Sequence, residues 1–178
     1  MKRGFYTIMC AQFLSSLADN ALLIAAIALL TSLSAPEWMT PLLKLFFVIS
    51  YILLAAWVGL FADLMPKGHV MFITNAVKVG GCLLMLFGSH PLISYAVVGI
   101  GAAAYSPAKY GILTELLPAE KLVIANGWIE GLTVVSIILG VVLGGVLVHP
   151  DVADTLMRVF HLEFFGVTNH AEAAIAMI

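Results

Sequence analysis

Five long apolar runs constrain this chain more than any other feature of its sequence. The hydrocarbon core of a bilayer is about 30 Å thick, and a helix needs about 20 apolar residues to cross it. Because unpaired backbone groups are costly in hydrocarbon, each run is expected to be helical. The sequence predicts helices at about residues 5–33, 42–62, 70–88, 92–113 and 122–148, and the start of a sixth at about 171–178.

The composition excludes the soluble alternatives. Of the 178 residues, 62% are hydrophobic and only 10% are charged, whereas soluble domains average about 45–50% and about 25%. The net charge of −2 provides no basic field for a nucleic-acid partner. Both cysteines, Cys10 and Cys82, lie in apolar runs, and no metal site or cofactor is predicted. We expect residues 1–178 to form an all-α polytopic membrane bundle.

The distribution of Lys and Arg indicates an orientation. Four of them lie on the side of the N-terminus and two on the opposite side: Lys2, Arg3, Lys67 and Lys121, against Lys44 and Arg158. Cytoplasmic connections are enriched in Lys and Arg, so the N-terminus is expected to be cytoplasmic. The polar stretch 149–170 is then an external connection. Because the chain stops at Ile178, eight residues into a new apolar run, we expect it to be the first half of a longer protein.

Ionisable residues inside the apolar runs are the candidate functional residues, because a charge in the membrane is costly unless it is paired or hydrated. Asp19 lies 14 residues after Phe5, which is about 21 Å along a helix and close to the bilayer midplane. Asp19 and Asn20 are expected to face the interior of the bundle. They provide either a contact for a substrate headgroup or ion, or a structural hydrogen-bonded pair.

Three further charges lie within later runs. Lys78 and Glu130 have similar predicted depths, so they either pair with one another or contact a substrate. Lys109 follows Pro107, which removes a backbone donor and bends a helix. Broken helices mark binding sites in transporters, so Lys109 is a candidate contact for a phosphate. The alternative is a lysine that extends to the headgroup layer.

Two other motifs have simpler interpretations. Gly140 and Gly144 form a G-x-x-x-G pattern, which predicts close helix packing in lipid. His149 and Asp154 match the H-x4-D pattern of glycerolipid acyltransferases. Two fixed positions in a short connection with no enzyme-sized domain around them arise easily by chance, so we take this match as accidental.

The junction between the second and third runs resembles the loop motif of the major facilitator superfamily. Gly59-Leu-Phe-Ala-Asp63 is followed by Lys67-Gly68-His69, although Leu64 replaces the usual arginine. A glycine there permits a tight turn, and Asp63 and Lys67 are expected to fix neighbouring helix ends during rocking.

A more specific resemblance covers about residues 4–148. It rests on four segments: AQFLS from Ala11, DNAL from Asp19, GAAAYSPAKYGIL from Gly101 and ANG from Ala125. Together they resemble the bacterial lysophospholipid transporter (LplT) family of the major facilitator superfamily. After Val148 the chain departs from that family, which usually turns quickly into its sixth helix, whereas here about twenty polar and mixed residues intervene.

The resemblance implies the N-terminal half of a twelve-helix flippase of the bacterial inner membrane. Such proteins move lysophosphatidylethanolamine and related lysophospholipids to the cytoplasmic leaflet, where an acyltransferase/acyl-carrier-protein synthetase reacylates them. The resemblance also implies that Asp19 and Asn20 are cavity contacts and that Lys109 contacts the lipid phosphate. Lys78 and Glu130 match polar positions of the family.

The residues alone leave other functions open. One is a proton- or sodium-coupled facilitator for a water-soluble solute, with Asp19 or Glu130 carrying the coupling proton. A second is the membrane part of a fused acyltransferase/synthetase. A third is a scaffold without transport activity. The resemblance favours a transporter over an enzyme.

Overall fold

The structure is a computed structural model that describes residues 3–162 and 166–178, without the side chains of residues 3, 55, 56 and 61–63. Within these ranges all regular elements are helices, which confirms the all-α prediction. They are α1 (Arg3–Ser32), α2 (Met39–Leu64), α3 (Lys67–Leu86), α4 (Pro91–Leu116), α5 (Ala119–Val148), α6 (Pro150–Phe160) and α7 (His170–Met177).

The sequence explains where these helices begin and end. Pro91 starts α4, where its missing N–H costs no hydrogen bond, and the His90 side chain accepts a hydrogen bond from the Leu92 N–H. The chain leaves α3 through Gly88 at φ +83°, a conformation that glycine adopts without strain. Because these connections are short, consecutive spans are antiparallel, and the connections alternate between the two ends of the bundle.

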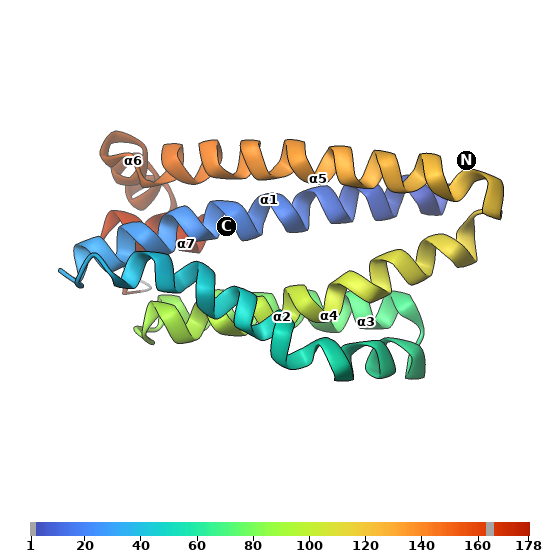
Figure 1. The fold of residues 1–178 in the computed structure, drawn as a ribbon. Helices are drawn as coiled ribbons and strands as arrows, with labels where there is room; N and C mark the ends of the chain where they lie inside the picture. Colours follow the sequence, from blue (N-terminus) through green and yellow to red (C-terminus); the bar gives the residue numbers. More distant parts are fainter. Residues whose placement is uncertain (1–2, 163–165) are drawn as a thin grey trace.

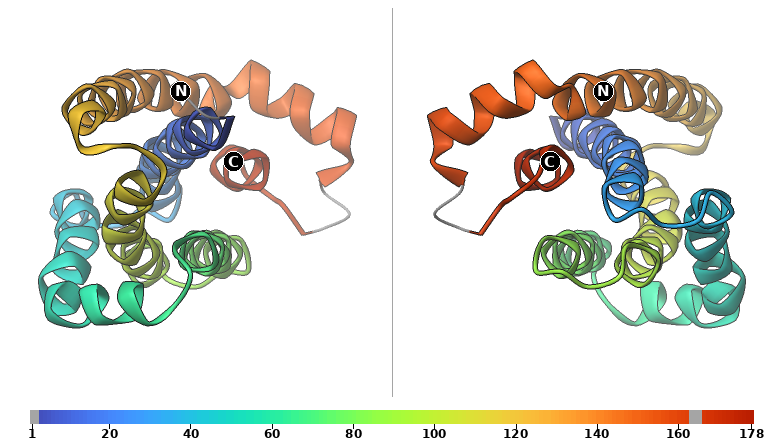
Figure 2. Two further views of the ribbon diagram at one scale, coloured as in Figure 1. Left: turned by 90° about the vertical axis from the view of Figure 1, so that its right-hand side faces the viewer. Right: turned by 90° about the vertical axis from the view of Figure 1, so that its left-hand side faces the viewer.

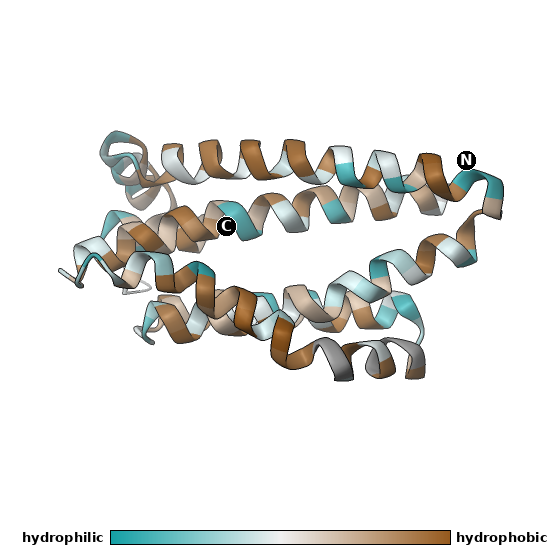
Figure 3. Ribbon diagram, viewed as in Figure 1, coloured by the Kyte–Doolittle hydropathy of each residue, from teal (hydrophilic) through white to brown (hydrophobic). Residues whose placement is uncertain are grey.

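Among residues 3–162 and 166–178, four helices are long and apolar enough to cross a membrane: α1 from Gly4, α3, α4 and α5. In α2, the apolar stretch found among the described residues is the shorter Met39–Leu54. Large apolar side chains of α5 are exposed along its length, including Val135, Ile138 and Val142, and the helix is strongly hydrophobic in Figure 3. This apolar exterior is that of a multi-pass membrane protein.

The long helices form two layers (Figures 1 and 2). In one layer α1 packs along α5, and α7 packs against both. In the other layer α4 packs between α2 and α3. The layers approach each other mainly where α1 passes α4. Polar side chains gather in the space between the layers, as described below.

Small residues bring the helices of each layer into backbone contact. A Cβ atom added at Gly140 would lie 2.5 Å from the Leu17 carbonyl oxygen, and one at Gly144 would lie 2.6 Å from that of Ala21. The G-x-x-x-G pattern therefore packs α5 directly on α1, as its sequence predicts. In the second layer Gly101 has the same role, because its Cβ would meet the Thr74 carbonyl oxygen of α3 at 2.6 Å.

The connection after Val148 differs from the expected polar loop. Residues 150–160 form α6, an amphipathic helix with Pro150 in its first turn and His161 in the left-handed conformation at its end. The segment forms a helix instead of an irregular loop because its apolar residues recur at helical spacing, although its overall composition is mixed. In Figure 2, α6 runs roughly at right angles to the spans.

Candidate substrate cavity

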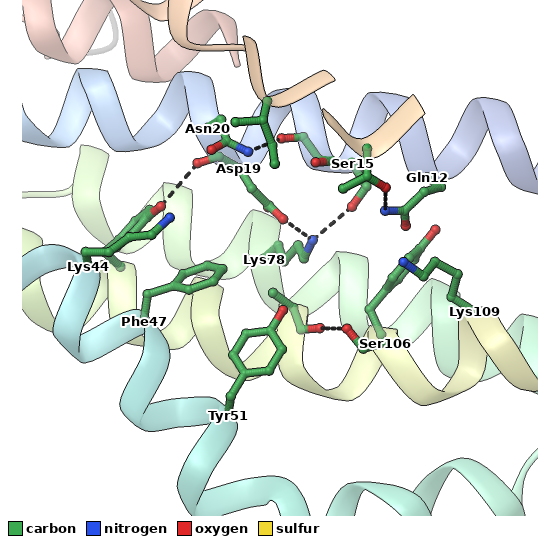
Figure 4. Close-up of a pocket in the computed structure, with 16 residues that line it drawn as sticks. Gln12, Ser15, Asp19, Asn20, Lys44, Phe47, Tyr51, Lys78, Ser106 and Lys109 are labelled. Carbon is green, nitrogen blue, oxygen red and sulfur yellow. Dashed lines mark hydrogen bonds and ion pairs between the residues drawn. The ribbon is translucent and has the colours of Figure 1, made fainter. Parts of the chain in front are cut away.

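A cavity of about 240 Å³ opens between the two layers. Five helices provide its walls, and most of the side chains drawn in Figure 4 are polar. Its lining residues are Gln12, Ser15, Ser16, Asp19 and Asn20 of α1; Lys44, Phe47 and Tyr51 of α2; Lys78 of α3; Tyr95, Ala102, Tyr105, Ser106 and Lys109 of α4; and Thr133 and Ile137 of α5.

Helical spacing brings these side chains to one place. The lining residues of α1 recur every three or four positions from Gln12 to Asn20, which places them on one face of the helix. The lining residues of α2 and α4 follow the same spacing. Asp19, Asn20, Lys78 and Lys109 are among the residues that the sequence predicts for the site, whereas Gln12 and Tyr105 are not. The spacing of polar residues on α1 is the signal that reveals Gln12.

The shortest ion pair of the cavity links α1 to α3. Lys78 Nζ lies 2.6 Å from Asp19 Oδ2 and also donates to Ser15 Oγ at 2.9 Å. The two charged side chains are only 9% and 15% exposed. Ser15 donates in turn to Asn75 at 3.1 Å. Since each charge satisfies the other, the pair is stable where either charge alone would be costly.

A second, looser ion pair links α4 to α5. Lys109 Nζ lies 3.8 Å from Glu130 Oε1, which is too far for a hydrogen bond, and it sits 4.4 Å from the centre of the Tyr110 ring. The Tyr110 hydroxyl hydrogen-bonds to Glu130. The Lys109 side chain is 7% exposed, whereas that of Glu130 is 56% exposed. Lys109 is therefore a buried cation whose counter-ion, Glu130, lies beyond hydrogen-bond distance.

This pairing corrects the expectation that Lys78 pairs with Glu130. In the structure Lys78 pairs with Asp19, and Glu130 pairs with Lys109. Equal depth in the membrane does not make two residues neighbours, because α3 packs on α4 while α5 packs on α1. Glu130 also lies beside the cavity, through Lys109 and Tyr110, rather than among its lining residues.

Two tyrosines of α4 differ in their hydroxyl groups. Tyr95 donates to the Asp19 carbonyl oxygen at 3.3 Å. The Tyr105 hydroxyl is buried and has no hydrogen-bond partner within residues 3–162 and 166–178. Buried hydroxyls normally find a partner. Because Tyr105 also lines the cavity, its unpaired hydroxyl is a candidate contact for a polar ligand that enters the cavity.

The motif at the α2–α3 junction is mainly helical. Gly59 and Asp63 lie inside α2, so Gly59 makes no turn, and the side chain of Asp63 lies outside the described part of the structure. Only residues 65 and 66 separate the helices. Lys67 begins α3 and its stem crosses α4, since a Cβ on Gly111 would lie 3.1 Å from Lys67 Cε.

The H-x4-D match has no catalytic geometry. Asp154 contacts His170 of α7 at 2.9 Å, and His149 lies 3.7 Å from Asp151. In the part of the chain that the structure describes, no group of three His, Cys, Asp or Glu residues is placed to hold a metal ion.

The cavity itself contains three lysines and one aspartate, a charge balance suited to a ligand that carries a negative group.

A helical membrane protein with a polar cavity between two layers of spans has the architecture of a transporter. A family model of the Major Facilitator Superfamily matches residues 8–152. The chain belongs to this superfamily.

Curated relatives confirm the more specific resemblance to the lysophospholipid transporter family. "Lysophospholipid transporter LplT" of Yersinia enterocolitica (serotype O:8 / biotype 1B) is 50% identical over 83% of this chain and 36% of its own length. The protein of the same name from Klebsiella pneumoniae strain 342 is 52% identical over 87% and 39%. That of Serratia proteamaculans strain 568 is 49% identical over 88% and 39%. The chain thus spans less than two fifths of the length of these relatives.

Proposed function

We propose that the chain is the N-terminal half of a lysophospholipid flippase of the bacterial inner membrane, with its N-terminus in the cytoplasm. Its substrates are lysophosphatidylethanolamine and related lysophospholipids, which an acyltransferase/acyl-carrier-protein synthetase reacylates at the cytoplasmic leaflet. The names of the relatives support this substrate class. The observation that carries the proposal is Lys109, a buried cation in the cavity wall with a distant partner.

Lys109 binds the phosphate of the lipid. A phosphate oxygen that approaches to hydrogen-bond distance is a better partner for Lys109 than Glu130 at 3.8 Å. Glu130 is then available to the ammonium group of an ethanolamine headgroup. One loose ion pair is thereby replaced by two closer ones, and no charge remains unpaired inside the membrane.

Asp19 and Lys78 have a supporting role in this mechanism. Because they are already paired at 2.6 Å, neither is available to bind a headgroup directly. They fix α1 against α3, so that Asn20 and Ser15 keep their places in the cavity wall. Asp63 and Lys67, at the end of α2 and the start of α3, fix these helix ends as the two halves of the transporter rock.

The test compares Lys109→Ala with Lys121→Ala in the complete protein. Lys121 lies in the first turn of α5, outside the cavity, and serves as a matched control for the loss of one lysine. In cells without endogenous lysolipid uptake, and with the acyltransferase present, labelled lysophosphatidylethanolamine is followed into its diacyl form. We expect Lys109→Ala to lose most uptake and Lys121→Ala to keep it. Near-normal uptake by Lys109→Ala at equal expression refutes the role of Lys109.

The same assay separates the substrate from the site. If the unmodified protein is inserted in the membrane but takes up no lysolipid, the substrate proposal fails. A solute whose uptake stops when an uncoupler is added then becomes the alternative to pursue.

A further inference from the structure

We infer that α6 is an interfacial helix, which lies in the plane of the membrane with one face among the lipids of a single leaflet. This inference concerns how the protein sits in the bilayer and does not depend on the proposed substrate. No residue of α6 lines the polar cavity. The two faces of the helix, its direction and its surroundings support this placement.

The residues of α6 divide into two faces. With 3.6 residues per turn, Val152, Leu156 and Phe160 fall on one side, and Asp151 and Arg158 fall on the other. Such a separation in a short helix of mixed composition is typical of helices that lie at a membrane surface.

Only part of the apolar face is covered by protein. Ala153 is fully buried against Val167 and Ala173, and Asp154 is linked to His170 at 2.9 Å, so α6 is docked in a fixed orientation on α7. Val159, about 120° round the helix from Ala153, is 64% exposed, and Phe160, on the side of Ala153 but at the end of the helix, is 51% exposed. This uncovered edge needs a partner other than the described part of the chain.

The position of α6 identifies that partner as lipid. The helix follows directly after α5, at the end of the bundle where α1 ends, α2 begins and α3 meets α4. Figure 2 shows α6 crossing the direction of the spans and projecting beyond them. A helix that extends sideways past the ends of the spans lies over the lipids that surround those spans.

Other connections at this end of the bundle also present large apolar side chains. Leu33 and Trp38 of the α1–α2 connection are 59% and 61% exposed, and Phe87 of the α3–α4 connection is 77% exposed. Tryptophan at the end of a span is typical of the headgroup layer, and Phe and Leu are typical of the lipid-facing side of interfacial helices. Phe160 has the same exposed apolar character as these connections, which places α6 at the depth of the headgroups. Its two aspartates and one arginine give no excess of positive charge, so anionic lipid is not required.

Site-directed spin labels test this placement in the protein reconstituted into vesicles. The first pair of positions is Phe160→Cys and Arg158→Cys, which are both exposed and lie on opposite faces. Cys10 and Cys82 are first replaced by alanine. Collisions are measured with oxygen, which concentrates in lipid, and with a water-soluble nickel chelate. We expect the label at 160 to favour oxygen several-fold over the label at 158, in vesicles of phosphatidylcholine alone as well as with phosphatidylglycerol.

A second pair, Leu156→Cys and Asp151→Cys, repeats the comparison earlier in the helix and guards against a local effect of one substitution. Equal exposure of both faces to the nickel chelate overturns the inference, because α6 then lies in water. Shielding of positions 156 and 160 from both reagents also overturns it, because protein then covers the apolar face. If the label at 160 favours oxygen only in vesicles that contain phosphatidylglycerol, the claim that α6 does not require anionic lipid is wrong.

Discussion

At the scale of single residues, the two ion pairs at the cavity differ in geometry and exposure. The Asp19–Lys78 pair is short and shares its lysine with Ser15, whereas the Lys109–Glu130 pair is long and half exposed. The first pair is suited to stabilising the structure, and the second is suited to exchanging partners. Substitutions in the first pair are therefore expected to affect stability, and substitutions in the second pair are expected to affect binding.

Removing one member of the tight pair is expected to destabilise the protein. Lys78→Met leaves the carboxylate of Asp19 buried and unpaired, which costs about 3–5 kcal/mol. Asp19→Asn is expected to cost a similar amount for the opposite reason. In the double variant no charge is left, so much of the loss is recovered. Thermal unfolding in detergent measures all three variants, and strictly additive losses show that the two residues are not coupled.

Tyr105→Phe is expected to weaken substrate binding without affecting folding. It removes a hydroxyl that has no partner in the described structure, so about 0.5–1.5 kcal/mol of binding is lost, or roughly two- to tenfold in Kd. Tyr6→Phe is the matched control, because Tyr6 is 59% exposed and does not line the cavity. The control should leave binding nearly unchanged. Unchanged binding by Tyr105→Phe contradicts a ligand contact.

At the scale of helices, the contact between α1 and α5 makes the sharpest prediction. Gly144→Val places side-chain atoms against the Ala21 carbonyl oxygen, which is only 2.6 Å from a Cβ at that position. We expect a loss of about 1–3 kcal/mol and a lower yield of folded protein. At Gly145 a Cβ meets nothing within 4 Å, so Gly145→Val is the control. Equal Tm values for the two variants argue against backbone contact between these helices.

The sequence predicts the helices well because apolar length is a strong local signal. The predicted ends of the five long helices lie within three residues of those in the structure. Helix α6 is not among the predicted helices because it has only 11 residues of mixed composition, whereas the predictions rest on long apolar runs. The partners of Lys78 and Glu130 were missed because charge and depth give no information about which helices are neighbours. That order is set by the close approaches at Gly101, Gly140 and Gly144.

At the scale of the whole molecule, the orientation in the membrane remains a prediction from Lys and Arg. Glu37 lies in the exposed connection before α2, and Lys121 lies exposed at the start of α5, at the opposite end of the bundle. With Cys10 and Cys82 replaced, a membrane-impermeant maleimide should label Glu37→Cys in intact cells. Lys121→Cys should react only after the cells are permeabilised. The reverse pattern places the N-terminus outside the cytoplasm.

The backbone contact of α5 on α1 also has a mechanical consequence. Two helices that pack backbone to backbone move together and resist bending more than either helix would alone. The α4–α5 junction is linked instead by the side chains of Lys109, Tyr110 and Glu130. The two layers are therefore joined by individual polar contacts, the tight Asp19–Lys78 pair and the loose Lys109–Glu130 pair, and a headgroup that binds Lys109 is expected to release the looser of the two.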